Sequence, residues 1–152
     1  MSLRSVQDFF ATHAPEIKVL ETETSSATVA LAAEAHDVDP DQIAKTICLK
    51  AGDTILLVVT AGMKRLDNCK FRGRFAAKPR MLGAEEVVEV TSHPVGGVCP
   101  FGLPSDLPVY CDVSLKNYAE VVPAAGAINA AVRISPERLV QLTKAEWVDV
   151  CQ

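Results

Sequence analysis

The stretch Ala44-Lys45-Thr46-Ile47-Cys48-Leu49-Lys50 is followed, after Ala51-Gly52-Asp53, by a second apolar run over residues 54–60. A Gly-Asp pair between two runs of apolar and β-branched residues predicts a β-hairpin. In the first run Ile47 and Leu49 alternate with more polar neighbours, which indicates a strand with one buried face. Lys45 stands where this strand begins, beside the core. Its ammonium must therefore reach solvent, find an anion or lose its charge.

Length and composition predict one globular domain over residues 1–152. Hydrophobic residues make up 49% of the chain, which is enough for a core and argues against disorder. No apolar run approaches the roughly 20 residues of a membrane helix, and the first residues lack the pattern of a signal peptide. The five cysteines are odd in number and form no C-x-x-C pair. We therefore expect reduced thiols, a cytoplasmic location and no contact with membranes.

Charge is unevenly distributed along the chain. Seven cations and a single acid between residues 64 and 80 give this segment a charge of +6, so the rest carries −10 of the total of −4. The cations are Lys64, Arg65, Lys70, Arg72, Arg74, Lys78 and Arg80. A concentrated basic patch on an acidic protein fits a local anionic partner such as one end of an RNA, and a solvated surface is the alternative.

Short helices and strands alternate along the chain. Apolar periodicity and capping residues predict helices over residues 6–13, 27–36, 66–71, 84–90 and 135–142, with Gly73 ending the third. Strands are predicted over residues 17–22, 44–50, 54–60, 109–112, 120–124, 128–134 and 147–150. This order predicts an α+β fold with a curved, mixed or barrel-like sheet.

A glycine-rich loop, Gly96-Gly97-Val98-Cys99-Pro100-Phe101-Gly102, interrupts this pattern. It has no Gly-Lys-Ser/Thr and so is not a P-loop. Adjacent glycines let the backbone approach a ligand and present N–H groups to an oxyanion, although a tight surface turn is the alternative. His93 adjoins the loop and is a candidate ligand contact. Cys99 is a candidate nucleophile with His93 as its partner.

Two further observations concern charged and metal-binding groups. Asp112 ends an apolar strand and needs a partner if it is half-buried, and Lys45 is a candidate. Such a pair would suit a structural bridge as well as a functional site. The spacings of cysteine and histidine match no zinc pattern, so we expect no metal and no cofactor.

Four segments together resemble the YbaK/EbsC family, whose members are stand-alone relatives of the editing domain inserted in bacterial prolyl-tRNA synthetases. They are Ile43-Ala44-Lys45-Thr46-Ile47, the loop from Val95 to Gly102, Pro108-Val109-Tyr110-Cys111-Asp112, and Ala125-Gly126-Ala127-Ile128-Asn129. The resemblance implies an α+β fold around a mixed, barrel-like sheet. It also implies hydrolysis of the ester that joins a wrong amino acid to the 3′ end of a tRNA.

The resemblance also implies roles for particular residues. Lys45, Gly97 and Asp112 would be catalytic, and Gly96, Val98, His93, Gly126 and Asn129 would bind the substrate. The tRNA acceptor end would lie on Lys64, Arg65, Lys70, Arg72 and Arg74. This sequence departs from the family at Thr91-Ser92-His93 and at Cys99, which leaves the edited amino acid open.

These groups suit ester hydrolysis. The reaction requires that the ester carbonyl is bound in a fixed position, that the oxyanion is stabilised and that the nucleophile is oriented toward the carbonyl carbon. Lys45 could bind phosphate or ribose or polarise the ester, and the nucleophile could be water activated by the terminal ribose hydroxyl. We therefore expect a trans-editing aminoacyl-tRNA deacylase, acting on tRNA-Pro or a related tRNA that carries a small amino acid such as Cys or Ala. A non-catalytic module that binds tRNA or a synthetase is the alternative.

Overall fold

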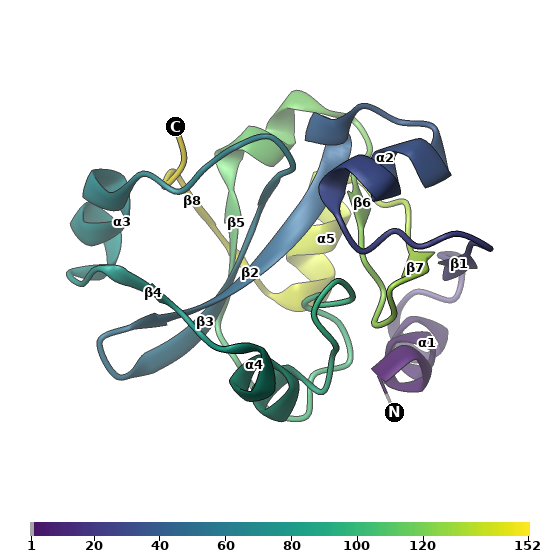
Figure 1. Ribbon diagram of the computed structural model, residues 1–152, viewed down its shortest axis with the longest axis horizontal. Helices are drawn as coiled ribbons and strands as arrows, with labels where there is room; N and C mark the ends of the chain where they lie inside the picture. Colours follow the sequence, from purple (N-terminus) through teal and green to yellow (C-terminus); the bar gives the residue numbers. More distant parts are fainter. Residues whose placement is uncertain (1) are drawn as a thin grey trace.

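The computed structural model describes residues 2–152, and the predicted hairpin lies at its centre (Figure 1). Strand β2 (Ile43–Ala51) pairs antiparallel with β3 (Thr54–Ala61) from Ala44 opposite Ala61 to Ala51 opposite Thr54. Gly52 occupies the turn with a φ of +61°, a conformation that costs glycine little. The hairpin prediction is thus confirmed.

The other elements surround this hairpin. The helices are α1 (Ser2–His13), α2 (Val29–His36), α3 (Asn68–Phe75), α4 (Ala84–Thr91) and α5 (Pro136–Thr143), with 3₁₀ turns η1 (Pro40–Gln42) and η2 (Val113–Asn117). The remaining strands are β1 (Leu20–Glu21), β4 (Pro79–Met81), β5 (Val109–Asp112), β6 (Val122–Pro123), β7 (Ala130–Ala131) and β8 (Glu146–Val148).

The main sheet is mixed and has the strand order β4-β2-β3-β5-β8, with β6 paired to β2 beside this path. β5 runs parallel to both β3 and β8, whereas β2 is antiparallel to β3 and β4. The α+β prediction is confirmed. The strand order has two ends and closes no barrel within residues 2–152, so the barrel-like closure is not confirmed.

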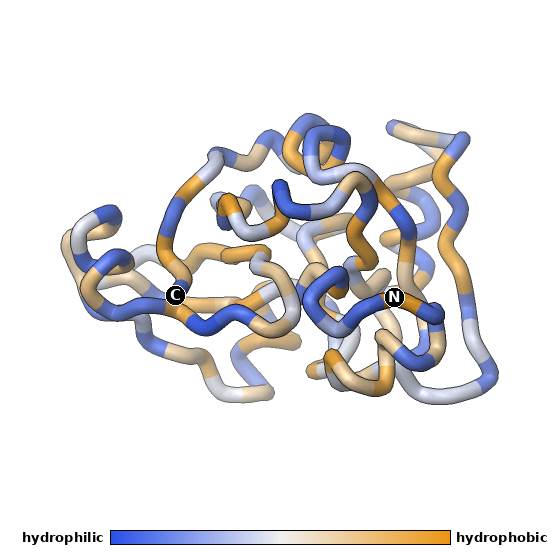
Figure 2. The backbone as a smooth tube through the Cα atoms, turned by 90° about the horizontal axis from the view of Figure 1, so that it is seen from above, coloured by the Kyte–Doolittle hydropathy of each residue, from blue (hydrophilic) through white to orange (hydrophobic). Residues whose placement is uncertain are grey.

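Strand β2 is buried on both faces, which corrects the expectation of a single buried face. Cys48 packs into the larger core with Leu57 and Cys111, whereas Leu49 packs on the other side with Phe71 and Val150. Helix α3 and the last residues of the chain cover this second face. In Figure 2 hydrophobic and hydrophilic residues alternate over short intervals of the tube, as short elements with a covered and an exposed side require.

The outer edge of β2 is interrupted. At its beginning Ile43 and Ala44 pair with β6, and at its end Leu49 to Ala51 pair with β4. Residues 45–48 between these ladders pair with β3 on one side and with no strand of residues 2–152 on the other. This gap positions the candidate site.

Capping residues set the helix ends as predicted, with one exception. Thr28 accepts a hydrogen bond from Leu31 N at 3.2 Å, and Ser135 accepts one from Arg138 N at 3.2 Å. Helix α3, however, continues through Gly73 to Phe75, with Ala76 as its C-cap. The ring of Phe75 packs 4.9 Å from that of Tyr110 on β5, so tertiary contact holds the additional turn.

Three predicted strands are much shorter than expected, and residues 17–22 contribute only Leu20–Glu21 of β1. Residues 120–124 and 128–134 contribute only β6 and β7 to regular ladders, joined by single bridges such as Val121 to Ile134. Pro123 lacks a donor, and Gly126 with a φ of +91° turns the chain between the two strands. Among residues 2–152, no helix has the length and apolar character that crossing a membrane requires.

Candidate functional site

A cavity of about 450 Å³ lies at the gap in the edge of β2. Residues 44–48 of β2 form one side of it, and α2 faces them with Val29 and Ala32. β4 and α4 contribute Met81 and Val87, and the glycine-rich loop contributes Gly96 and Val98. The part of the lining that residues 2–152 contribute is mostly apolar and contains neither a carboxylate nor an imidazole. Chemistry in this cavity therefore depends on the few polar groups that reach it.

Among residues 2–152, Lys45 is the one cationic residue in the lining. Its ammonium donates to the carbonyl oxygens of Gly62 at 3.1 Å and Lys64 at 2.5 Å. Partial burial lowers its pKa from the ordinary 10.5, an effect that nearby Asp41 partly opposes. Within residues 2–152 these bonds use two of the three N–H donors, which leaves one for a ligand.

Thr46 and Cys48 extend the lining, and the sequence interpretation did not identify either as a site residue. The Thr46 hydroxyl is buried and has no hydrogen-bond partner among residues 2–152. Buried hydroxyls are usually paired, so a polar group of a ligand in the cavity would complete its bonding. Burial raises the pKa of the Cys48 thiol, which is therefore neutral at ordinary pH. Alternation with Ile47 places both residues on one face of the predicted strand, but the sequence gives no sign of the cavity there.

The two adjacent glycines differ in what they contact. Gly96 lines the cavity with a φ of +92°, and a Cβ placed there would lie 2.9 Å from the Cβ of Ala27. Gly97 is the buried residue of the pair. Its N–H donates to Pro94 O at 2.8 Å, and its carbonyl accepts from Gly126 N at 3.0 Å. Gly96 is thus placed beside a ligand, while the N–H of Gly97 is already bonded.

His93 and Cys99 are buried and do not line the cavity. The side chain of His93 is completely buried, with Nε2 2.8 Å from Phe101 O and Nδ1 2.6 Å from Ser2 Oγ. Burial lowers the pKa of His93 and raises that of Cys99 to about 12. A thiol with that pKa is not a nucleophile at neutral pH, although its sulfur lies 3.5 Å from His93 Nε2. The geometry therefore gives no support to a Cys99 nucleophile.

Gly126 and Asn129 also hold backbone segments together. A Cβ on Gly126 would lie 2.8 Å from the Ser2 carbonyl oxygen, so glycine permits α1 to approach this turn. Asn129 donates from Nδ2 to Thr22 O at 3.0 Å and joins β7 to the segment after β1. Neither residue lines the cavity. Their predicted substrate contacts have no counterpart in this geometry.

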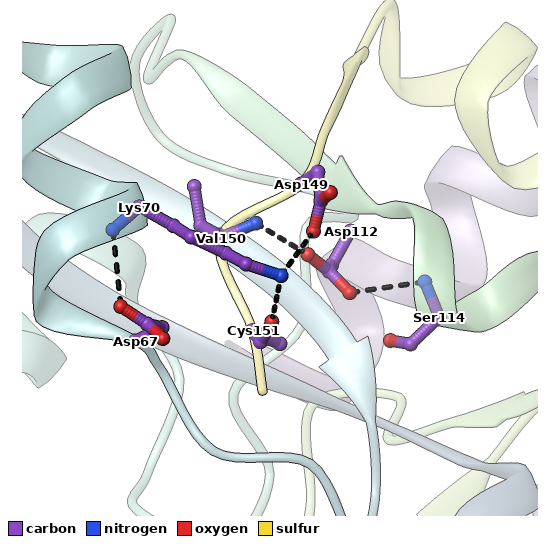
Figure 3. Close-up of polar contacts among 7 residues, drawn as sticks. All are labelled: Asp67, Lys70, Asp112, Ser114, Asp149, Val150 and Cys151. Atoms are coloured by element: carbon purple, nitrogen blue, oxygen red, sulfur yellow. Dashed lines mark hydrogen bonds and ion pairs between the residues drawn. The ribbon is translucent and has the colours of Figure 1, made fainter.

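Asp112 is buried at the end of β5 and bonds the backbone (Figure 3). One carboxylate oxygen accepts from Ser114 N at 2.9 Å and the other accepts from Val150 N at 2.8 Å. Lys45 instead bonds backbone carbonyls, so the expected Lys45–Asp112 pair is absent from residues 2–152. Asp112 does not line the cavity, and its expected catalytic role stays a prediction.

The basic segment divides into paired and unpaired cations. Lys70 bonds Asp149 at 3.1 Å and Cys151 O at 2.9 Å, as Figure 3 shows. Arg74 bonds Glu146 at 2.8 Å. Lys64, Arg65 and Arg72 form no ion pair within residues 2–152. These three cations are therefore the members of the predicted RNA-binding set whose charge no acid neutralises.

The comparisons with known proteins identify the family. The profile of the aminoacyl-tRNA editing domain matches residues 23–142. The chain therefore belongs to this family, which confirms the resemblance to YbaK/EbsC proteins.

Individual relatives agree with this assignment. The uncharacterised protein YwhH of Bacillus subtilis is 46% identical over all of this chain and 98% of its own length. A crystal structure provisionally described as a trans-editing enzyme for prolyl tRNA synthetase superposes with a TM-score of 0.92 at 34% identity, and covers 99% of this chain and 97% of the other. The proline–tRNA ligase of Bacillus pumilus is 27% identical over 86% of this chain, which spans only 22% of that ligase.

Replacing Gly96 by alanine should lower stability and reshape the cavity. The positive φ and the contact with Ala27 both oppose a side chain, so we expect a loss of about 1–3 kcal/mol in the free energy of unfolding. Gly73→Ala is the matched control, because open space surrounds Gly73 within a helix and alanine should stabilise it by about 0.5–1 kcal/mol. Urea titration measures both, and equal effects would contradict the close approach of the loop to α2.

Asp112→Asn should mainly lower the free energy of unfolding. The rate of hydrolysis per folded molecule should change less. The amide retains one acceptor oxygen, so one buried N–H loses its partner at a cost of about 1–3 kcal/mol. Asp149→Asn, which breaks an exposed ion pair, should cost about 0–1 kcal/mol. A fully stable Asp112→Asn protein without hydrolytic activity would instead place the carboxylate in the reaction.

Proposed function

We infer that this chain is an aminoacyl-tRNA deacylase that acts in trans on mischarged tRNA. The observation that carries this inference is the position of Lys45, which lines an apolar cavity together with Gly96 at the interrupted edge of β2 and keeps one N–H donor unused. Membership of the editing-domain family supports the same activity. The proposed substrates are tRNA-Pro, or a related tRNA, carrying a small amino acid such as Cys or Ala.

The cavity suits the aminoacyl ester at the 3′ end of such a tRNA. The apolar wall from Val29, Ala32 and Val87 would surround the amino acid side chain, while the unpaired edge of β2 would face its polar atoms. A wall of this kind discriminates weakly, since one methylene is worth ~1–3 kcal/mol. A separate hydrolytic check then adds to the selectivity of the synthetase.

Hydrolysis adds water to the ester carbonyl and breaks the bond to the ribose oxygen, which leaves with a proton. The ammonium of Lys45 would donate its remaining hydrogen bond to the oxyanion or to the terminal phosphate. Because no carboxylate or imidazole of residues 2–152 lines the cavity, the neighbouring ribose hydroxyl of the substrate would accept the proton of the attacking water and pass its own proton to the leaving ribose oxygen. Gly96 offers the loop's backbone for a second contact to the carbonyl, while Gly97 would hold the loop in place.

The partners follow from this activity. The acceptor end of tRNA would lie against Lys64, Arg65 and Arg72, with Lys70 and Arg74 joining only if their acidic partners release them. A synthetase is a further candidate partner, and the role in translation would place the protein in the cytoplasm.

Lys45→Ala should lower the single-turnover rate of deacylation by about 10²–10³, the usual effect of losing one donor to an oxyanion. The loss of two hydrogen bonds to backbone carbonyls should cost about 1–3 kcal/mol of stability, so the protein should remain folded. A panel of tRNAs mischarged with Ala, Cys, Ser and Pro, measured beside thermal unfolding, provides the test.

Lys18→Ala is the matched control for that experiment, because Lys18 is exposed and precedes β1, at the opposite end of the molecule from β4 (Figure 1). It should leave both rate and stability unchanged. Full activity of the Lys45→Ala protein would exclude Lys45 from catalysis. A wild-type protein that binds tRNA but cleaves no member of the panel would be a binding module.

The unpaired cations predict a particular dependence on salt. Neutralising Lys64, Arg65 and Arg72 together should reduce the slope of log affinity against log salt by about 2, as the loss of about three phosphate contacts requires. Neutralising Lys70 and Arg74 should change the slope less, because Asp149 and Glu146 already neutralise them. Fluorescence anisotropy with labelled tRNA measures both slopes, and equal changes would contradict this division of the segment.

A further inference from the structure

Two cations that form no ion pair within residues 2–152, Lys50 and Arg80, lie opposite each other on neighbouring strands. In the antiparallel ladder of β2 and β4, Lys50 lies directly opposite Arg80. Directly opposite residues project from the same face, with Cβ atoms roughly 4.5–5.5 Å apart, and like charges in this arrangement repel each other. The pair therefore destabilises the ladder unless an anion lies near it.

Among residues 2–152, no acid forms an ion pair with either cation. On the other side of Lys50 the opposite residue is Ile55 of β3, which is apolar. Glu86 on α4 is near enough for its charge to raise the pKa of Cys48, yet it forms an ion pair with neither cation. The position thus lacks the counter-charge that its two cations require.

The pair also lies beside the candidate site. Met81 follows Arg80 directly, lines the cavity and is 66% exposed, so it marks the mouth. Val95 lines the same cavity and is 61% exposed. A polymer whose end enters the cavity past these residues would carry its next segment close to β4 and the end of β2.

We propose that Lys50 and Arg80 together bind a backbone phosphate of the RNA strand whose 3′ end enters the cavity. This assignment rests on the proposed function, because it takes the cavity as the site of the aminoacyl end. A phosphate between the two cations supplies the missing charge and converts their repulsion into binding. RNA fits better than an acidic protein segment, since the cation pair is next to a cavity that accepts a chain end.

The test measures RNA affinity and protein stability in one double variant, Lys50→Gln with Arg80→Gln. The probe is deacylated tRNA-Pro transcript ending in CCA, followed by anisotropy between 50 and 200 mM salt. Two lost phosphate contacts reduce the salt slope by about 1.5, so wild type should lose about tenfold more affinity across this range than the variant does. The melting temperature should stay equal or rise, because the variant no longer opposes two like charges.

Two controls separate charge from fold. The double exchange Lys50→Arg with Arg80→Lys keeps both charges and should retain the wild-type slope. Lys18→Gln removes one charge at the opposite end of the molecule and should leave affinity unchanged.

Three outcomes would overturn the assignment: an unchanged slope in the glutamine variant, wild-type protein that binds no tRNA, or a variant that loses affinity only for a synthetase. A different result would show that the proposed function is wrong. If tRNA binds with the predicted slopes but no mischarged tRNA is hydrolysed, the phosphate site stands and the deacylase activity does not.

Discussion

The site depends on how the edges of one strand are paired. β3 pairs with β2 over nearly its whole length, whereas β6 and β4 share the other edge and leave residues 45–48 with no strand of residues 2–152 on that edge. Helices α2 and α4 and the glycine-rich loop line this gap, so it opens into a cavity. The helices and loops around it then form a cavity whose walls come from segments distant in sequence.

Hydrogen bonds to two backbone carbonyls explain how the charged lysine is tolerated so close to the core. Burial lowers the pKa of Lys45, which means that the surroundings disfavour its charged form. The carbonyls of Gly62 and Lys64, where the chain leaves β3, compensate by accepting two hydrogen bonds. Lys45 lines the cavity, and no carboxylate of residues 2–152 forms an ion pair with it, so its charge remains available to an anionic ligand. A salt bridge to Asp112 would have neutralised that charge.

Local signals in the sequence predicted the elements well. The Gly-Asp turn specified the hairpin, and Ser135 specified a helix start, because these features need only neighbouring residues. The end of α3 was wrong because the contact of Phe75 with Tyr110 on β5 outweighs the preference of Gly73. The single buried face of β2 was also wrong, since α3 and the chain's last residues cover the second face from a distance in sequence.

The residues predicted for the site do not all lie together, and their roles stay predictions. Lys45, predicted to be catalytic, lines the cavity with Gly96 and Val98, which were predicted to bind the substrate. The other predicted residues, Gly97, His93, Asp112, Gly126 and Asn129, hold the surrounding backbone. The sequence does not distinguish residues that line the cavity from residues that hold the backbone. A glycine is needed wherever a side chain would collide, whether with another segment of the protein or with a ligand. Thr46 was missed because only the three-dimensional gap in β2 shows that its hydroxyl has no partner.

The most direct test of this account locates the aminoacyl group itself. A non-hydrolysable 3′-aminoacylamino analogue of the terminal adenosine can be titrated into ¹⁵N-labelled protein and followed by NMR. The account predicts that the largest shift changes fall on the amides of Lys45, Thr46 and Gly96, around the gap in β2. Saturable changes confined to another surface, with these three amides unaffected, would contradict it.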